Sequence, residues 1–297
     1  MIDEKLETLI TVAECKNFTR ASELLNLTQP AVSHHINQLE KEIGAKLFIR
    51  GKEIKITKEG EIALIYAKRM MNLEQNMLRK IVDEKNNITR LTIGVTHSSE
   101  NTDITELLAK YANDHPNVTI SLITDNIKNL YDKLENYELD LAIVEGKRLS
   151  NKLNYLMLDT DYLVAVVGNS NELAKKSSIK LEELKNQNMI LRLPGSATRE
   201  LFEASLISNN ESIHNFNVSL EVDSINTIKT LVKKGLGVSI LSKSSCLYDA
   251  KKNKLKILPI QNLNMMREIN IVYNKDFHQK SFLDDIYDLY QNNIANK

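Results

Sequence analysis

Apolar residues in the first sixty positions recur at helical spacing in three successive segments. In each segment they fall on one face of a helix, so we interpret them as the packing residues of a three-helix core. The three sets are Leu6, Leu9, Ile10 and Ala13; then Ala21, Leu24 and Leu25; then Val32, Ile36, Leu39 and Ile43. Thr19 and Thr28 are predicted to cap the second and third helices, and Gly44 is predicted to end the third.

A hairpin is predicted directly after the third helix. Apolar and polar residues alternate through residues 46–50 and again through residues 53–57, on either side of Gly51. Such alternation around a glycine is typical of two short antiparallel strands. Two helices joined by a tight turn and followed by a hairpin predict a winged helix-turn-helix over residues 1–58, whose second helix fits a DNA major groove.

The next segment carries the longest helical pattern in the chain. From residue 58 to about residue 84 there is no proline, and apolar residues repeat every three or four positions, close to a heptad seam. These residues are Ile62, Tyr66, Met70, Leu73, Met77 and Ile81. A helix with an apolar stripe and no core of its own needs a partner, so residues 59–87 are predicted to form a dimerising linker helix. The alternative is that the stripe packs on the body of its own chain.

From residue 90 the pattern changes to alternating strands and helices. Strands are predicted at 91–95, 118–123, 139–144, 162–167, 189–193, 217–222, 238–241 and 268–273, with helices after most of them. Strands separated by helices imply parallel sheets covered on both faces. The predicted class is therefore α/β, with a two-lobed periplasmic-binding-protein-like (type 2) domain over residues 88–297. Lobe I is expected at about 90–160 and 267–297, and lobe II at about 161–266.

Two loops of this domain are candidate ligand sites, because such folds bind ligands where strands end and the next helices begin. One is Thr96-His97-Ser98-Ser99, and the other is the segment from Pro194 to Arg199. Small hydroxyl residues beside helix N–H groups suit an anion or a carboxylate, and Arg199 can add positive charge. The predicted effector-binding residues are Thr96, Ser98, Ser99, Gly195, Ser196, Thr198 and Arg199. The alternatives are ordinary helix capping by both loops and pairing of Arg199 with a nearby carboxylate.

The composition qualifies the DNA-binding interpretation. The 297 residues hold 39 Lys+Arg against 39 Asp+Glu, a formal net charge of +0, which argues against a uniformly basic nucleic-acid coat. The balance is uneven, however: eight basic residues face four acidic ones between Lys16 and Lys58, whereas one faces four in residues 1–15. Positive charge therefore gathers on the third helix and the hairpin.

Polar side chains at the start of the third helix are the candidates for reading base edges. Gln can pair bidentately with adenine, and Ser, Thr and His can bond bases or phosphates. The helix-turn-helix segment is predicted to run from Phe18 to Asn37. The predicted DNA contacts are Arg20, Thr28, Gln29, Pro30, Ser33, His34, His35 and Asn37, with Arg50 and Lys52 on the wing.

Cysteine use and hydropathy narrow the setting. Cys15 and Cys246 are the two cysteines of the chain, so a disulfide scaffold is excluded, and no Cys/His cluster has zinc-site spacing. The acidic start lacks the features of a signal peptide, and no apolar run approaches the roughly 18 residues of a membrane span. We expect a cytoplasmic protein with no metal, no cofactor and no membrane partner.

One stretch of the sequence resembles a known family. The string R-A-S-E-L-L-N-L-T-Q-P-A-V-S-H-H-I-N-Q-L-E-K-E-I-G-A-K-L-F-I-R from Arg20, with K-I-T-K-E-G at 55–60, resembles the DNA-binding domain of LysR-type transcriptional regulators. L-D-L-A-I at 139–143, K-x-G-L-G-V at 233–238 and G-S-x-T-R at 195–199 extend the resemblance to the C-terminal part. The wing between Arg50 and Thr57 is shorter than is usual in the family and carries fewer arginines.

The resemblance implies a DNA-binding transcription regulator that answers a small-molecule effector, an anion or a carboxylate, bound between the two lobes. It implies double-stranded promoter DNA as a partner and a homodimer or homotetramer, with the linker helix as dimer contact. An enzyme is disfavoured, because the sequence has no nucleophile elbow, Walker loop or metal cluster and no G-x-G-x-x-G after a strand. The predicted winged helix argues against a binding protein without a regulatory role. A redox switch is also disfavoured, because it would need two cysteines in the C-terminal domain, and Cys246 is the only one there.

Overall fold

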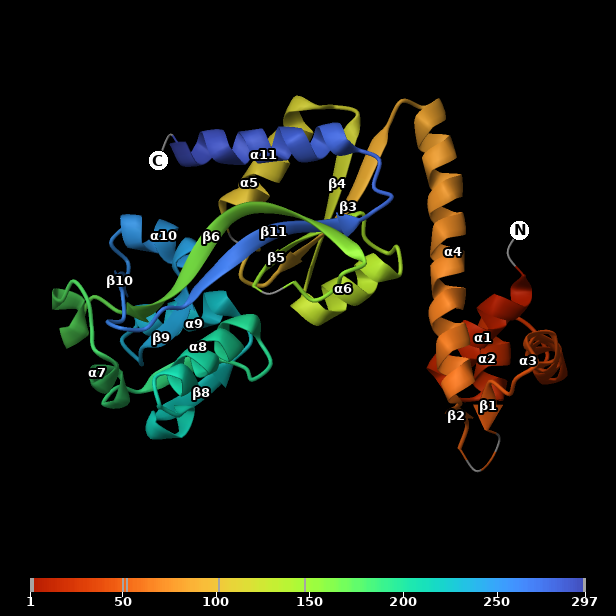
Figure 1. Cartoon of the computed structure of the whole chain (residues 1–297), viewed down its shortest axis with the longest axis horizontal. Coiled ribbons are helices and arrows are strands. Elements are labelled where there is room, and N and C mark those ends of the chain that lie inside the picture. Colours follow the sequence, from red (N-terminus) through yellow and green to blue (C-terminus); the bar gives the residue numbers. More distant parts are fainter. Residues whose placement is uncertain (1–2, 50, 52, 101, 147, 296–297) are drawn as a thin grey trace. The chain divides into compact units, whose positions relative to one another are not determined.

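The structure of the chain, a computed structural model, describes residues 3–49, 51, 53–100, 102–146 and 148–295. The chain divides into two compact units (Figure 1). The first comprises Met1–Thr89 with Glu135–Glu138, and the second comprises Arg90–Leu134 with Leu139–Lys297.

The first unit contains the three short helices and the hairpin that the sequence predicts. Its elements are α1 (Glu4–Cys15), α2 (Phe18–Leu25), α3 (Gln29–Ile43), β1 (Phe48–Ile49), β2 (Lys55–Ile56) and α4 (Lys58–Lys85). The strands pair antiparallel, with Phe48 opposite Ile56. Leu9, Val12, Ala21, Val32, Ile36 and Leu39 are buried together in one core, whereas Leu24 and Ile43, which were predicted to pack there, are exposed. The winged helix-turn-helix is therefore confirmed as a fold.

The helix ends follow the predicted caps with one exception. Thr28 caps α3 by accepting a hydrogen bond from the N–H of Ala31 at 3.3 Å, and Gly44 ends that helix at φ +76°. The prediction that Thr19 caps α2 is wrong. Asn17 caps α2 instead. It stands directly before the helix, so its side-chain oxygen can accept hydrogen bonds from the N–H groups of Thr19 and Arg20 in the first turn.

Helix α4 begins at the cap residue Thr57, which accepts from the N–H of Gly60 at 2.9 Å. Its N-terminal half packs on α1, where Ala67 is buried in the core of the unit. All six residues of the predicted seam are exposed within the single chain: Ile62, Tyr66, Met70, Leu73, Met77 and Ile81. Contacts within the single chain therefore do not bury the apolar stripe of α4.

The second unit consists of two α/β lobes. Lobe I is built from β3 (Thr89–Thr96), α5 (Asp103–Asp114), β4 (Val118–Asp125), α6 (Ile127–Glu135), β5 (Leu141–Glu145) and α11 (Lys280–Ala295). Lobe II is built from the 3-10 helix η1 (Glu172–Lys175), α7 (Leu181–Lys185), β7 (Met189–Arg192), α8 (Ala197–Ser208), the 3-10 helix η2 (Ile213–Asn215), β8 (Val218–Val222), α9 (Ile225–Lys233), β9 (Ser239–Ser242), α10 (Lys243–Lys251) and β10 (Lys256–Leu258). Strands β6 (Leu153–Val167) and β11 (Met266–Asn274) belong to both lobes.

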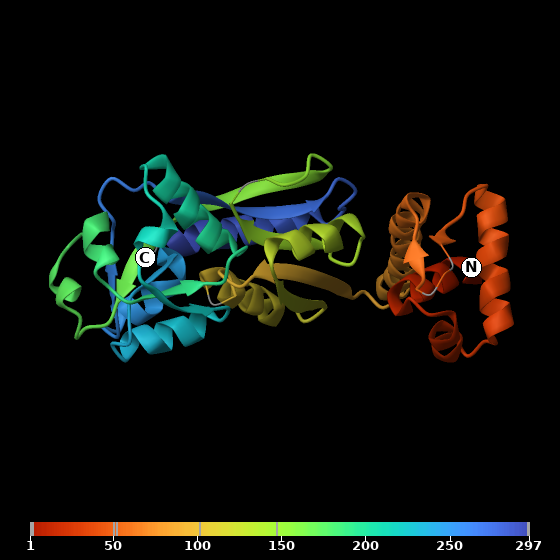
Figure 2. The ribbon, with the colours of Figure 1, turned by 90° about the horizontal axis from the view of Figure 1, so that it is seen from below.

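The long strands β6 and β11 join the lobes, running side by side from one to the other (Figures 1 and 2). Both are antiparallel to their neighbours: β11 to β5 and β6, and β6 to β9 and β10. The prediction of parallel sheets therefore needs correction. Parallel pairing holds for β3 with β5 and for β7 with β8, whereas the joining strands cross between lobes and return in the opposite direction. Strand β6 also begins earlier than predicted, at Leu153.

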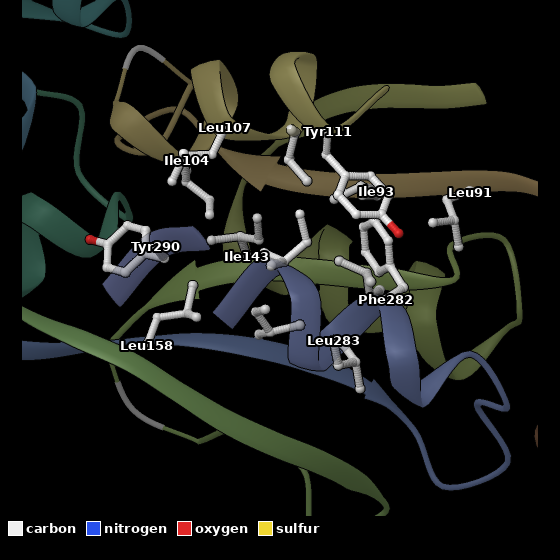
Figure 3. Close-up of a cluster of buried hydrophobic side chains, with 14 of the residues drawn as sticks. Leu91, Ile93, Ile104, Leu107, Tyr111, Ile143, Leu158, Phe282, Leu283 and Tyr290 are labelled. Atoms are coloured by element: carbon white, nitrogen blue, oxygen red, sulfur yellow. The ribbon is translucent and has the colours of Figure 1, made fainter. Parts of the chain in front are cut away.

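Helices α5 and α11 cover one face of the sheet of lobe I. Their apolar side chains meet those of β3 and β5 in one core, in which Leu91, Ile93, Ile104, Ile143 and Phe282 are buried (Figure 3). Tyr111 packs edge-on against Phe282 and donates a hydrogen bond to Asp285 at 3.0 Å. This core fixes the end of β3, where the first candidate ligand loop begins.

Candidate nucleic-acid interface and ligand cleft

The start of α3 presents polar side chains to solvent. Thr28, Gln29, Pro30 and His34 are exposed, Ser33 is half-buried, and Arg20 on α2 is exposed. Pro30 stands in the first helical turn, where its missing N–H leaves no hydrogen bond unmade. The opposite face of α3 is buried at Val32, Ile36 and Leu39, so packing holds the polar face outward. This geometry suits insertion into a major groove.

His35 occupies a different position from the other predicted contacts. Its Nδ1 lies 2.9 Å from the hydroxyl oxygen of Thr8, and its side chain is half-buried between α3 and α1. We attribute to His35 a role in holding α3 against α1. Asn37, one turn after Ser33, is exposed. The wing residues Arg50 and Lys52 lie outside the described residues.

Glu40 is a residue that sequence reasoning missed. Its buried carboxylate accepts hydrogen bonds from the backbone N–H of Leu47 at 2.9 Å, from that of Phe48 at 3.4 Å and from the ammonium of Lys46 at 2.6 Å. Burial raises the pKa of Glu40, but the Lys46 ammonium and the two N–H groups outweigh it and bring the pKa below its usual value. Glu40 thus ties α3 to the wing. The L-E pair of the family string was the available signal.

The two candidate ligand loops meet inside the second unit. The hydroxyl oxygens of Ser98, after β3, and Thr198, in the first turn of α8, lie 3.5 Å apart and are buried. Ser196 caps α8 by accepting from the N–H of Arg199 at 3.3 Å, and Gly195 before it has φ +83°. The sequence prediction that these loops face each other across the lobes is therefore consistent with the geometry.

Arg199 follows the alternative considered for it. Its guanidinium is 6% exposed, lies 3.2 Å from the Glu221 carboxylate and donates to the carboxylate of Glu203. Because both partner carboxylates belong to lobe II, they neutralise the positive charge of Arg199 within that lobe. The main role of Arg199 is therefore to hold the loop in place, and little of its positive charge is available to a ligand.

The hydroxyls of the first loop hold a carboxylate of the chain itself. Thr96 donates to one oxygen of Glu145 at 2.5 Å, and Ser99 donates to the other. Glu145 ends β5 and is 2% exposed. These hydroxyls were predicted to contact an anionic ligand, yet they are satisfied by Glu145. The sequence hid this contact because the two partners are more than forty residues apart.

Two buried arginines stand beside this carboxylate, and neither was predicted. Arg192, at the end of β7, donates to Asp223 at 3.0 Å, while its Nε has no hydrogen-bond partner among the described residues. Arg267, on β11, forms a longer ion pair with Asp161 at 3.6 Å. Among the described residues, no hydrogen-bond partner is present for any of the three guanidinium nitrogens of Arg267. Burial lowers the pKa of Arg192, Asp223 opposes this, and Arg267 lowers it further. Leaving buried guanidinium nitrogens without hydrogen-bond partners costs free energy, so an anionic ligand group that accepts from them would bind favourably.

The loops and the charged residues line two adjoining cavities. The smaller, of about 30 Å³, is lined by Thr96, Ser98, Glu145, Arg192, Gly195 and Thr198, among others. The larger, of about 620 Å³, is lined by Glu145 and Arg267 and by apolar side chains including Leu201 and Met266. Ile127, Glu145 and Ala197 contribute to both linings. The first cavity is too small for an organic ligand, whereas the second lies in the usual size range of small-molecule sites.

Other features of the described residues limit the chemistry. No group of three or more His, Cys, Asp or Glu in them is arranged to hold a metal ion. Cys246 is fully buried, and burial raises the pKa of its thiol to about 11, so the thiol is protonated at neutral pH. No helix in the described part of the chain is long and apolar enough to cross a membrane.

Comparison with known proteins agrees with the two-part architecture. The family "LysR substrate binding domain" matches residues 85–294, and "Bacterial regulatory helix-turn-helix protein, lysR family" matches residues 4–61. The HTH-type transcriptional activator CmpR of Synechocystis is 30% identical over 293 residues, covering 95% of this chain and 94% of its own.

Two solved structures show the same fold. The regulatory domain of Synechocystis CcmR, in complex with 2-PG, is 25% identical with a TM-score of 0.61, covering 69% of this chain and 98% of that one. Full-length CbnR, complexed with its target DNA, is 18% identical with a TM-score of 0.69, covering 98% of this chain and 99% of that one.

Proposed function

Because this chain belongs to the LysR family of transcriptional regulators, we propose that it reads promoter DNA with the exposed start of α3 and answers a small anionic effector bound between its lobes. It is a regulator and not an enzyme, and its partners are DNA, a small molecule and further copies of the chain. The observation that carries the DNA assignment is the polar face of α3, which packing against α1 and α2 turns toward solvent.

Gln29 and Ser33 are the proposed base-reading residues. They stand one helical turn apart at the N-terminal end of α3, the end that reaches base edges in helix-turn-helix proteins. We propose that Arg20, Thr28, Pro30, His34 and Asn37 add contacts to bases or phosphates, and that Arg50 and Lys52 do so from the wing. We assign residues 1–58 to DNA binding, 59–87 to the linker helix and 88–297 to effector binding, in a cytoplasmic protein.

The double substitution Gln29→Ala with Ser33→Ala is expected to abolish sequence-specific footprinting on the promoter. A good bidentate base contact contributes about 1–3 kcal/mol of discrimination, so its loss weakens specific binding by roughly fivefold to more than a hundredfold. DNase footprinting across a salt series measures the effect. The far-UV circular dichroism spectrum is expected to stay unchanged, because neither side chain belongs to the buried core.

The matched control for this experiment is Gln38→Ala. Gln38 is exposed on α3 but lies nine residues from Gln29, about half a turn around the helix at roughly 100° per residue. Its replacement is expected to leave the footprint intact. Sequence-specific binding that survives in the double variant would contradict the reading of DNA by α3.

The effector part of the proposal is supported by the site and by a relative. Ser98, Gly195, Ser196 and Thr198 lie where the loops after β3 and β7 meet at the N-terminus of α8, and a helix N-terminus favours negatively charged groups. The related CcmR regulatory domain is known in complex with 2-PG, a small anion. An effector held by both lobes would stabilise one relative placement of the lobes, and the bound DNA would respond to it.

Replacing Ser98 and Thr198 together with alanine is expected to abolish the effector response and to spare DNA binding. The two hydroxyls come from different lobes, so their loss removes polar contacts on both sides of a bound ligand. Mobility-shift titrations with 2-PG and a panel of small organic acids measure the response. The control pair is Thr119→Ala with Ser208→Ala, which are exposed in lobe I and lobe II respectively. A normal response in the Ser98/Thr198 variant refutes the site.

A further inference from the structure

We infer that the effector is a small zwitterion with an apolar tail, an α-amino acid or a close equivalent, whose acidic group pairs with Arg192 and Arg267 and whose cationic group pairs with Glu145. This inference rests on the proposed function, because it assumes that the space between the lobes binds an effector. It narrows the effector from any small anion to one that carries both charges.

The carboxylate of Glu145 is the first reason. It is 2% exposed, and its recorded hydrogen-bond partners are the hydroxyls of Thr96 and Ser99. A carboxylate accepts about four hydrogen bonds, so it keeps capacity for another donor. A buried carboxylate without a paired cation is costly, and it repels an incoming anion at the same place. A ligand ammonium removes both difficulties.

The two guanidinium groups are the second reason. Arg267 and Arg192 are 5% and 4% exposed, and four of their nitrogens have no hydrogen-bond partner within the described residues. A carboxylate fits the planar donor edge of a guanidinium with two parallel hydrogen bonds. Glu145 lines one cavity together with Arg192 and the adjoining cavity together with Arg267, so the three groups lie in one neighbourhood.

The charge balance of this neighbourhood decides between a simple anion and a zwitterion. Arg192 is already paired with Asp223 and Arg267 with Asp161, so Glu145 is the buried carboxylate of this neighbourhood for which the described residues show no ion pair. An anion would add a negative charge that nothing buried compensates, whereas a zwitterion adds one charge of each sign. Glu145 and Arg267 also share a face of the sheet, because Glu145 pairs with Ile269 and residues two apart on a strand point the same way. One small ligand can therefore span them.

The larger cavity supplies the place for an apolar tail. It has a volume of about 620 Å³, and Glu145 and Arg267 line it together with Ile127, Leu149, Leu201 and Met266. Met266 is 59% exposed, so a ligand would cover apolar surface that now faces water. Burying such surface favours binding at about 25 cal/mol per Å². A polar zwitterion without a tail would leave this wall unused.

Three probes that share the same isobutyl tail test the inference on the full-length protein. L-leucine carries both charges, 4-methylpentanoate carries the acid alone, and 3-methylbutylamine carries the amine alone. Isothermal titration is expected to show leucine, or another apolar amino acid of the twenty standard ones, binding at least about tenfold more tightly than its acid-only and amine-only analogues. The measurement compares ligands with the same apolar tail, so the differences in affinity report on the charged groups.

Variants identify the residues that select the ligand. Glu145→Gln keeps the shape of the side chain and removes its charge, so it is expected to weaken the zwitterion and to strengthen the acid-only analogue. Arg267→Met is expected to weaken both, and Arg267→Lys should restore part of the binding if the methionine variant folds poorly. Glu172→Gln and Lys128→Met, at exposed positions in η1 and α6, are the matched charge controls and should change nothing.

Two outcomes overturn the inference. One is wild-type protein that binds acid-only analogues as tightly as zwitterions, or none of the twenty amino acids at all. The other is a Glu145→Gln variant with unchanged preference. Either result would leave the proposed function standing if the organic-acid panel still alters DNA binding through Ser98 and Thr198. If no small molecule changes DNA binding, the proposed effector function itself fails.

Discussion

Gly60→Ala is expected to unfold the winged helix-turn-helix, although alanine is normally the better helix residue. A Cβ atom at this position would lie 2.2 Å from the carbonyl oxygen of Leu47 and 2.7 Å from a side-chain carbon of Ile56. Alanine gains about 1 kcal/mol over glycine in a helix. Overpacking against a fixed backbone costs about 3 kcal/mol or more, so the clash decides the sign.

The backbone at Leu47 has little freedom to retreat from that clash. Its carbonyl accepts the N–H of Thr57 at 3.0 Å, and its own N–H donates to the buried Glu40 carboxylate. Thermal unfolding followed by circular dichroism, with footprinting as the functional measure, tests the prediction. Gly51→Ala is the matched control, because a Cβ there would meet nothing closer than 3.8 Å and Gly51 is exposed. A Gly60→Ala protein as stable as wild type would show that the wing and α4 do not pack as described.

Leu73→Glu with Met77→Glu is expected to lower DNA affinity by roughly a hundredfold or more without unfolding the subunit. Both side chains lie on the α4 stripe and are 41% and 43% exposed in the single chain, so the charges disturb no core of the isolated subunit. In an assembly, two like charges on each copy would face apolar partners across the helix pair. Linking two DNA-reading heads raises avidity by about 10²–10⁴, and separation of the copies forfeits that gain.

Analytical ultracentrifugation measures the assembly and mobility shift measures the affinity. The control is Gln75→Glu, which adds a negative charge at an exposed position of α4 between the two, on another side of the helix. It is expected to alter neither quantity. Unchanged sedimentation of the double variant would mean that α4 does not join the copies, and the exposed stripe would need another partner.

The sequence predicted the elements of the first unit well because their causes are local. Helical spacing placed α1 to α3, Thr28 and Thr57 capped their helices, and alternation around Gly51 produced the wing. The misplaced cap shows the limit of local reasoning. Asn17 and Thr19 are both good cap residues, and the choice between them depends on where the chain leaves α1 in space.

The features of the candidate sites also divide into those that local sequence patterns predict and those that depend on distant contacts. The polar start of α3 could be found from sequence because exposure there follows from the spacing of apolar residues on the other face. The loops at Thr96–Ser99 and Gly195–Arg199 could be found because strand ends mark ligand sites in such folds. The pairing of Arg199 with Glu203, four residues further along α8, is local and was foreseen as an alternative. The occupancy of Thr96 and Ser99 by Glu145 and the contact of His35 with Thr8 could not be found, because each joins side chains far apart in the sequence.

By itself, the sequence determined the order of helices and strands, the two-part architecture and the place of the reading helix, since periodicity and capping act over a few residues. The tertiary structure alone decided the antiparallel course of β6 and β11 and the placement of Arg192 and Arg267 in two adjoining cavities that both include Glu145. Strand pairing and charge burial depend on contacts between residues that can lie more than a hundred positions apart, and no local pattern records the partner.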